Sequence, residues 1–414
     1  MGYQQGLSGL AASSNDLDVI GNNIANANTV GFKQSSAQFA DIYANTVATS
    51  VNTQIGLGTS LSEVQQNFSQ GTITTTGQAL DVAINGSGFF QMSNNGTLTY
   101  SRNGVFQLDK NGFITDAAGN DLMGYAAGTS GVVNSAQTVP LQVPTTNIAP
   151  VATSNITAQV NLNAQATAPT STTFDPTDSN SYNYSTSITA YDSLGGTQQV
   201  NMYFVQNATG SAEVYAGVAG GAMTDMGTMT FNSSGALTSV TPATGANAGT
   251  PQTNGQFSLD ITPTDGAAAQ TITLNLTGTT QYGGTSGVNN LAQDGYASGT
   301  LSNFTVGSDG TITGNYSNGQ TKTLGQVVLA NFNNPNGLQN LGGNQFQETA
   351  ASGVAQVSTP GSTNHGTLTG GAVESSNVDL TNQLVDLITA QRNYQANAQT
   401  IKTQQTVDQT LLQM

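Results

Sequence analysis

The side chains that could carry out acid–base or metal chemistry are few, and they lie far apart. The single histidine, His365, lies in a loop rich in Gly, Ser and Asn, and the chain contains no cysteine. A zinc site or a Cys–His pair needs further ligands of these types, so we interpret His365 as a surface-loop residue. The sequence therefore predicts no histidine-based or thiolate-based metal site.

Carboxylates and glycines give three weaker patterns. Asp109–Gly112, followed by Asp116, partly matches a calcium loop but lacks its glycine at position six and glutamate at position twelve. Asp175 and Asp178 are spaced like paired carboxylates, yet the polar stretch around them is typical of turns. Gly86–Gly88 lacks the third glycine and the following helix of a phosphate-binding loop. We predict no catalytic residue, no cofactor and no metal, and hence no enzyme.

Composition excludes other classes of function. The 414 residues include 6 Lys+Arg and 22 Asp+Glu, which gives a net charge of −16, and only 7% of residues are charged. A nucleic-acid-binding protein needs clustered basic side chains, and here they are scattered. No apolar run approaches the roughly 20 residues that span a bilayer. We therefore predict neither nucleic-acid binding nor membrane insertion.

The N-terminal segment has the spacing of an amphipathic helix. Apolar residues recur in steps of four and three at Tyr3, Leu7, Leu10, Leu17 and Ile24, with Ile20 beside a gap in the series. This pattern predicts a helix of roughly 25 residues over 2–27.

The C-terminal segment repeats the pattern without a gap. Its members are Leu380, Leu384, Leu387, Gln391, Tyr394, Ala398 and Ile401. Ser376 followed by Asp379 resembles a capping box, which predicts that the helix begins near Asn377. A helix over 377–412 would be about 50 Å long, which is too long for the surface of a small globule.

The middle of the chain is predicted to be almost entirely β. Short alternating runs are separated by turn dipeptides that favour hairpins, at 95–96, 103–104, 111–112, 195–196, 309–310 and 318–319. The fold class is therefore mainly β with α-helical termini that pair as a coiled-coil-like core, plus nested β-domains. The predicted parts are a helical core (1–30 and 375–414), connecting segments (31–70 and 356–374), an inner β-domain (71–150 and 291–355) and an inserted outer β-domain (151–290).

Two terminal helices alone bury too little apolar surface to offset the cost of ordering them. One interpretation is a long intramolecular coiled-coil stalk. The other is that the helices pack against copies from other subunits and become ordered on assembly. The residues predicted to take part in assembly are Leu7, Leu10, Leu17, Ile20, Ile24, Leu380, Leu384, Leu387, Tyr394 and Ile401.

Three long motifs resemble a known family. The stretch 17–33, which contains Asn-Asn-Ile-Ala-Asn-Ala-Asn-Thr-Val-Gly-Phe-Lys, resembles the N-terminal signature of bacterial flagellar rod and hook proteins, and 374–403 resembles their C-terminal signature. The stretch 77–90, with 100–104 downstream, is similar to the start of their first β-domain. Gln383 departs from the pattern, since family members often carry an acidic residue there. The motif residues carried over are Asn22, Asn23, Asn26, Thr29, Gly31, Phe32, Lys33, Gln391, Arg392 and Tyr394.

Chain length favours the hook branch of this family, because a rod protein is expected to lack most of the 151–290 insert. The resemblance implies a structural subunit that self-assembles into a curved, flexible tube, which transmits motor torque as a universal joint. It also implies contacts with the distal rod protein, the hook cap, the hook–filament junction proteins and the flagellar type III export apparatus. The expected location is the extracellular flagellar hook, reached without a cleaved signal peptide, since no basic and apolar leader precedes Lys33.

Two alternatives come from other classes of protein. A surface adhesin or phage-tail-like fibre also has a polar, Thr/Gly/Asn-rich β-composition. A carbohydrate-active enzyme on a β-scaffold would need an acid and a base paired in a cleft.

Overall fold

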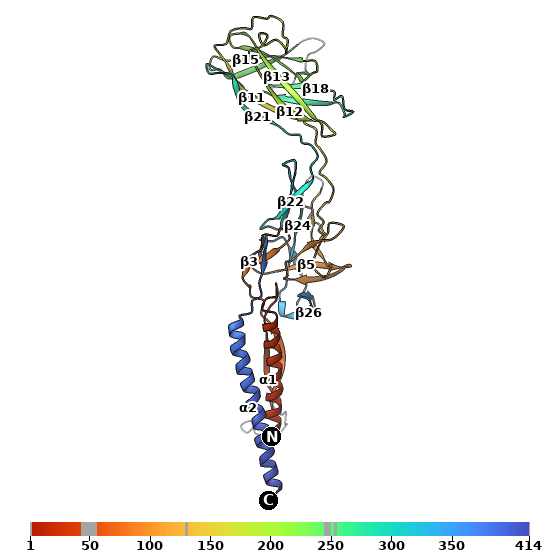
Figure 1. The fold of residues 1–414 in the computed structure, drawn as a ribbon, viewed down its shortest axis with the longest axis vertical. Coiled ribbons are helices and arrows are strands. Elements are labelled where there is room, and N and C mark those ends of the chain that lie inside the picture. Colours follow the sequence, from red (N-terminus) through yellow and green to blue (C-terminus); the bar gives the residue numbers. More distant parts are fainter. Residues whose placement is uncertain (1, 43–55, 129–130, 244–249, 252–254, 414) are drawn as a thin grey trace. The chain divides into compact units, whose positions relative to one another are not determined.

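The computed structural model describes residues 2–42, 56–128, 131–243, 250–251 and 255–413 (Figure 1). Its contacts divide the chain into two compact units. Unit 1 comprises Met1–Thr145, Ser302–Asn315 and Thr321–Met414, and unit 2 comprises Thr146–Leu301 and Tyr316–Gln320. The finer division into helical, connecting, inner and outer parts stays a prediction.

Two helices from opposite ends of the chain lie side by side in unit 1. They are α1 (Gly2–Ala25) and α2 (Leu380–Leu412), and they run antiparallel (Figure 1). The cap of α2 differs from the prediction. Asp379 accepts hydrogen bonds from the backbone N–H groups of Thr381 and Asn382, and so it occupies the N-cap position that the sequence pattern gave to Ser376. The helix begins three residues later than expected.

A β-hairpin follows α1 and packs along it. Its strands are β1 (Ser35–Ile42) and β2 (Gly58–Gln66), which pair antiparallel from Ser35↔Gln66 to Ile42↔Gly58. Gln5 Nε2 donates to the Gly56 carbonyl at 2.7 Å, which joins α1 to the start of this second strand. This part of the predicted connecting segment is therefore regular structure.

The rest of unit 1 is a large sheet with small accessory strand pairs. Along its main path the sheet contains β22 (Leu301–Val306), β23 (Thr311–Tyr316), β24 (Thr321–Val327), β9 (Asp121–Ala126), β5 (Phe89–Asn94), β6 (Thr97–Ser101), β27 (Gln345–Gln347) and β26 (Gln339–Gly342). Attached to it are β7 (Gln107–Leu108), β8 (Ile114–Thr115), β10 (Val139–Pro140), β25 (Leu329–Asn331) and β28 (Gln356–Ser358). A 3₁₀ turn, η1 (Pro335–Gly337), precedes β26.

Two short antiparallel pairs tie the later part of the chain to the first part of this unit. They are β3 (Ile73–Thr75) with β30 (Ala372–Glu374), and β4 (Val82–Asn85) with β29 (Thr367–Gly370). An aromatic cluster forms part of the core of this unit, and in it Tyr100 and Phe332 meet edge to face with ring centroids 4.8 Å apart. The two connections between helices and sheet are thus hydrogen-bonded to each other.

Unit 2 is a β-sandwich with one shared core. Its first sheet contains β11 (Asn155–Asn163), β17 (Thr250–Pro251), β18 (Gln256–Ile261), β19 (Gln270–Asn275), β20 (Thr280–Tyr282) and β21 (Gly287–Gln293). Its second sheet contains β12 (Tyr184–Tyr191), β13 (Thr197–Ala208), β14 (Ser211–Val218), β15 (Thr224–Phe231) and β16 (Leu237–Pro242). Alternate residues of β11 are buried, as a strand with one face on a core requires. Side chains of both sheets, such as Val160 and Phe204, belong to a single buried cluster.

The predicted fold class, mainly β with paired helical termini, is confirmed. The predicted turns at 95–96, 111–112, 195–196, 309–310 and 318–319 each join adjacent strands of one sheet. The prediction at 103–104 is wrong. There the Gly104 carbonyl accepts from Val82 N–H at 2.9 Å, so the segment bends towards another part of the chain instead of closing a hairpin.

Candidate functional site

The face of α1 that meets α2 is made mostly of small and polar residues, with Ile20 as its one large apolar side chain. Its members recur in steps of three and four at Gly6, Gly9, Ser13, Asp16, Ile20 and Asn23. A Cβ atom placed on Gly6 would lie 3.0 Å from Ile401 Cγ1, and one on Gly9 would lie 2.7 Å from Asn397 Oδ1. The glycines therefore allow the two backbones to approach closely.

An amide network closes the end of the helix pair nearest the sheet. Asn23 Nδ2 donates to Gln383 Oε1 at 3.0 Å and to the Ser35 carbonyl at 2.7 Å, and Ser35 N–H donates back to Asn23 Oδ1 at 2.9 Å. Asn23 and Gln383 are both buried. One side chain of α1 thus holds both α2 and β1, and Gln383 meets a neutral amide at this position.

The predicted assembly residues occupy several different environments. Ile20 is buried, whereas Leu10, Leu17, Ile24, Leu387 and Ile401 are half-buried. Leu7, Leu380, Leu384 and Tyr394 stay exposed, Leu7 at 51% and Leu384 at 45%. The apolar stripe identified from the sequence is therefore only partly used in pairing the two helices of one chain. Its role in assembly stays a prediction.

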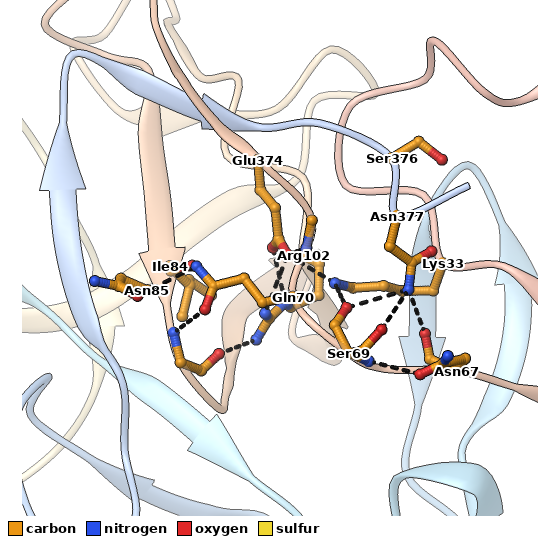
Figure 2. A network of polar contacts seen from close by, with 12 residues as sticks. Lys33, Asn67, Ser69, Gln70, Ile84, Asn85, Arg102, Glu374, Ser376 and Asn377 are labelled. Atoms are coloured by element: carbon orange, nitrogen blue, oxygen red, sulfur yellow. Dashed lines mark hydrogen bonds and ion pairs between the residues drawn. The ribbon is translucent and has the colours of Figure 1, made fainter. Parts of the chain in front are cut away.

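A buried ion cluster lies where the helix segments join the sheet (Figure 2). Lys33 Nζ lies 2.7 Å from Glu374 Oε1, and Arg102 Nε lies 3.1 Å from Glu374 Oε2. The three side chains are 0–3% exposed. Lys33 follows α1, Arg102 follows β6, and Glu374 ends β30, so the cluster joins the two terminal segments to the sheet.

The cluster contains two cations and one carboxylate, so backbone carbonyls complete the solvation of the cations. Lys33 Nζ also donates to the Ser69 carbonyl at 2.7 Å, and Arg102 Nη1 donates to the carbonyls of Gly86 and Gly88 at 2.9 and 2.6 Å. Burial, together with the charge of Arg102, lowers the pKa of Lys33 despite the opposing effect of Glu374.

Backbone contacts reinforce the same junction. Gly31 has a φ of +71°, its N–H donates to the Glu374 carbonyl at 2.8 Å, and a Cβ atom there would lie 2.7 Å from Asn103 N. Asn377 Oδ1 accepts from Gln34 N–H at 2.8 Å, and Asn377 Nδ2 donates to the Asn67 carbonyl at 2.8 Å. At position 31, only glycine combines a positive φ with so close an approach to the backbone of Asn103.

The other motif residues form the end of α1 or lie on the surface of α2. Thr29 Oγ1 donates to Asn26 Oδ1 at 3.1 Å, and Asn26 Nδ2 donates to the Asn22 carbonyl at 3.0 Å, which closes the turn after the helix. Phe32 is half-buried, whereas Gln391 and Arg392 are exposed. The structure therefore brings Gly31 and Lys33 together with Glu374, but it does not bring Gln391 or Arg392 to that cluster.

The side chains first considered for chemistry are engaged in turns and loops. His365 Nε2 lies 2.9 Å from the Gln356 carbonyl. Asp109 accepts from Phe113 N–H at 2.7 Å, Asp175 accepts from Thr177 N–H and Oγ1, and Asp178 accepts from Asn180 N–H. Across the described ranges no three His, Asp or Glu side chains are grouped so as to hold a metal ion. Within those same ranges no helix is both long and apolar enough to cross a membrane.

Several residues of the site were not predicted as such. Arg102 and Glu374 lie inside the family motifs, but nothing in their local spacing indicates that they meet Lys33. Gly6, Gly9 and Ser13 have helical spacing of small residues, a pattern that permits close packing but is hidden by the stronger apolar stripe.

Family models match successive parts of the chain. They are described as "Flagella basal body rod protein" (residues 4–33), "Flagellar hook protein FlgE/F/G D1 domain" (83–165), "Flagellar basal body protein FlaE D2 domain" (161–296) and "Flagellar basal body rod FlgEFG protein C-terminal" (369–414).

Full-length relatives agree with these models. The flagellar hook protein FlgE of Salmonella typhimurium strain LT2 is 41% identical over 425 residues, which cover 100% of both chains. That of Treponema pallidum is 32% identical over 99% of this chain and 98% of its own. The crystal structure of Helicobacter pylori flagellar hook protein FlgE2 aligns with 71% of this chain and 98% of its own, with a TM-score of 0.47 and 14% identity. Since relatives more than 30% identical extend over essentially the whole sequence, the chain belongs to the flagellar hook protein family.

Proposed function

We propose that this chain is the structural subunit of a bacterial flagellar hook, which polymerises with itself into a curved, flexible tube that passes torque from rod to filament. The observation that carries the proposal is the exposed apolar stripe on the paired helices, in a chain of the hook family. The relatives that match the whole chain are hook proteins, and so we set aside the fibre and carbohydrate-enzyme alternatives.

Burial explains why the helices should associate with other copies. Leu7, Leu380, Leu384 and Ile388 each expose 45–51% of their surface in the single chain. Covering such side chains releases about 25 cal/mol per Å² of apolar area. A head-to-tail contact that does not close a ring produces a helical polymer, which is the form that a tube requires.

Low charge suits a polymer that bends. Only 7% of residues are charged, while uncharged polar side chains dominate the composition. Such side chains exchange direct hydrogen bonds for water-bridged ones at little cost, so contacts between β-domains could shift as the tube bends.

The finer parts of the proposal come from the family. The tube would contact the distal rod protein at one end and the hook cap or the hook–filament junction proteins at the other. Its subunits would travel through the flagellar type III export apparatus to the extracellular hook without losing a signal peptide. The helical segments would form the inner tube, and unit 2 would be an outer domain.

Polymerisation of the purified chain tests the proposal. We expect the wild type to form curved tubes visible by negative-stain electron microscopy, and a variant that ends at Asp379 to stay soluble and monomeric. The double variant Leu380→Asn/Leu384→Asn should also fail to polymerise while keeping its unfolding transition, since both side chains are already exposed.

Leu194→Asn is the matched control, because Leu194 is also open to solvent, at 63%, but belongs to unit 2 and not to the helices. It should polymerise normally. Normal tubes from the chain that lacks α2, or a wild type that never polymerises, would contradict the proposed function.

A further inference from the structure

A solvent-open cavity between α1, α2 and β1 carries negative charge without a cation. This helix groove has a volume of about 190 Å³ and is lined by Asp16 and Asn23 of α1, by Gln383, Asp386 and Asn393 of α2, and by Ser35–Ala37. It opens to solvent because Asp386 and Asn393 are exposed. A second cavity of about 410 Å³ shares Asp16 and Asn393 and continues the groove along Gly9, Ala12 and Ala396.

The two carboxylates of the groove, Asp16 and Asp386, repel each other. Burial and the charge of Asp386 raise the pKa of Asp16. Among the described residues the ion pairs are those of Glu374 with Lys33 and Arg102, so neither groove carboxylate is neutralised within the chain. A cation from outside would remove this repulsion.

Gln383 contributes a polar amide to the wall of the groove. Its side chain is 4% exposed and lines the cavity. The Oε1 atom accepts from Asn23, but Nε2 donates to no atom in the described part of the chain. Nε2 itself keeps contact with solvent, so water satisfies it in the open groove, and an amide or carbonyl oxygen of an occupant can take the place of that water.

The opposite face of α2 carries the complementary groups. Gln383, Ala390 and Asn397 face α1, and an exposed stripe of residues in steps of three and four lies on the opposite side of α2. This outward stripe consists of Val385, Ile388, Arg392, Gln395, Gln399 and Lys402. Arg392 and Lys402 are the basic residues of the two helices, and neither forms an ion pair in the part of the chain described. Gln395, one turn from Arg392, offers an amide oxygen.

We propose that the outward stripe of one copy packs into the helix groove of a neighbouring copy, with Arg392 of the first entering between Asp16 and Asp386 of the second. Two features support this occupant: complementary charge across the contact, and small residues that leave room for an approaching helix. Val385 and Ile388, which are 58% and 51% exposed, would be covered in the same contact. The inference rests on the proposed function, since it specifies how copies of the chain meet.

Charge exchange across the contact provides the first test. Arg392→Asp should raise the concentration needed for polymerisation about tenfold or more, because it places a third carboxylate in the groove. Asp386→Arg should have a similar effect. The double variant Asp386→Arg/Arg392→Asp restores opposite charges between copies and should return this concentration to within about threefold of the wild type.

Lys110→Asp is the matched control, since Lys110 is an exposed cation outside the helices and the change in net charge is the same. It should leave polymerisation unchanged. If Arg392→Asp behaves like this control, the inference is overturned while the proposed function stands. If Asp386 variants act but Arg392 variants do not, a small cation occupies the groove and the inference is likewise wrong. Failure of the wild type to polymerise would contradict the proposed function instead.

Cross-linking provides the second test, and it does not depend on a change in affinity. The chain contains no cysteine, so Asp16→Cys/Arg392→Cys introduces the only thiols. Position 392 faces away from α1, so these two thiols can bond only between copies. Mild oxidation of polymerised protein should give a ladder of covalent oligomers on a non-reducing gel, whereas Asp16→Cys/Lys110→Cys should not. Polymers that contain no cross-linked chains would overturn the inference.

Discussion

At the level of single residues, Glu374 is the side chain on which the junction of unit 1 most depends. It is the sole carboxylate of the buried cluster. It forms ion pairs with two cations, Lys33 and Arg102, which belong to different segments of the chain, and its single charge neutralises one of them. Its backbone carbonyl also accepts from Gly31 N–H. A buried charge without a partner is far more costly than a buried pair. Loss of the carboxylate should therefore reduce the free energy of unfolding more than loss of one cation.

Glu374→Gln should reduce the free energy of unfolding of unit 1 by about 3–5 kcal/mol, because it leaves both cations buried and unpaired. Lys33→Met should cost less, roughly 1–2 kcal/mol, because the remaining Arg102–Glu374 pair is neutral and the methionine fills the same space. Urea unfolding followed by circular dichroism measures both. Equal losses would show that net charge does not govern the cluster.

Sequence reasoning identified Lys33 as a motif residue but not its contacts. The partner lies 341 positions away, and a lone Lys and a lone Glu have no periodicity that connects them. The Asn23–Gln383 contact is equally hidden, because both residues look like solvent-exposed amides in a polar sequence. Long-range polar pairing depends on the folded topology, which local spacing does not determine.

At the level of elements, the helices were predictable whereas their contact face was not. Apolar residues in steps of four and three predicted both helices, and hydrophobicity directed attention to the stripe at Leu7, Leu384 and their neighbours. The chain instead pairs its helices largely through glycines and polar groups, with Ile20 and Ile401 as apolar members, and the glycines permit a close approach. The stripe remains available for other copies, so the apolar pattern describes the proposed polymer better than it describes the single subunit.

The cap of α2 gives a prediction at this scale. Asp379→Ala should destabilise the first turn of the helix by about 1 kcal/mol, because Thr381 and Asn382 lose their acceptor. Ser376→Ala is the control, since Ser376 lies outside the helix and its hydroxyl accepts from Val378 N–H, a residue that also precedes the helix. Hydrogen exchange at the amides of 381–383 should accelerate only in the first variant; equal acceleration in both would contradict the assignment of the cap.

At the level of the whole molecule, two units with separate cores should respond separately to solution conditions. The sandwich of unit 2 depends at its edge on Asp294, whose carboxylate accepts from Ser154 N–H and Oγ and from Asn155 N–H and Nδ2. Although burial opposes ionisation, these hydrogen bonds together lower the pKa of Asp294 from 3.8 to about 2.

A carboxyl group whose pKa is lowered in the fold stabilises the fold at pH values above its pKa in the unfolded chain, which is about 3.8. This contribution is lost as the pH falls towards 2. Because Asp294 is exposed, solvent screening reduces the contribution to about 1 kcal/mol. Wild type should therefore be more stable than Asp294→Asn at pH 5 by this amount, and the difference should vanish near pH 2. Thermal unfolding of unit 2 across this range measures it; a difference independent of pH would contradict the role of the carboxylate.

The antiparallel helix pair also bears on the order in which the molecule forms. Asn23 and Gln383, which join α1 to α2, are 360 positions apart, whereas most hairpins of the two units close loops of a few residues. The entropy lost on closing a loop grows with its length, and contacts between distant residues slow folding. Refolding should therefore form the local hairpins of each unit first, and the pairings of distant segments, the union of the two helices among them, should belong to the last and slowest kinetic phase.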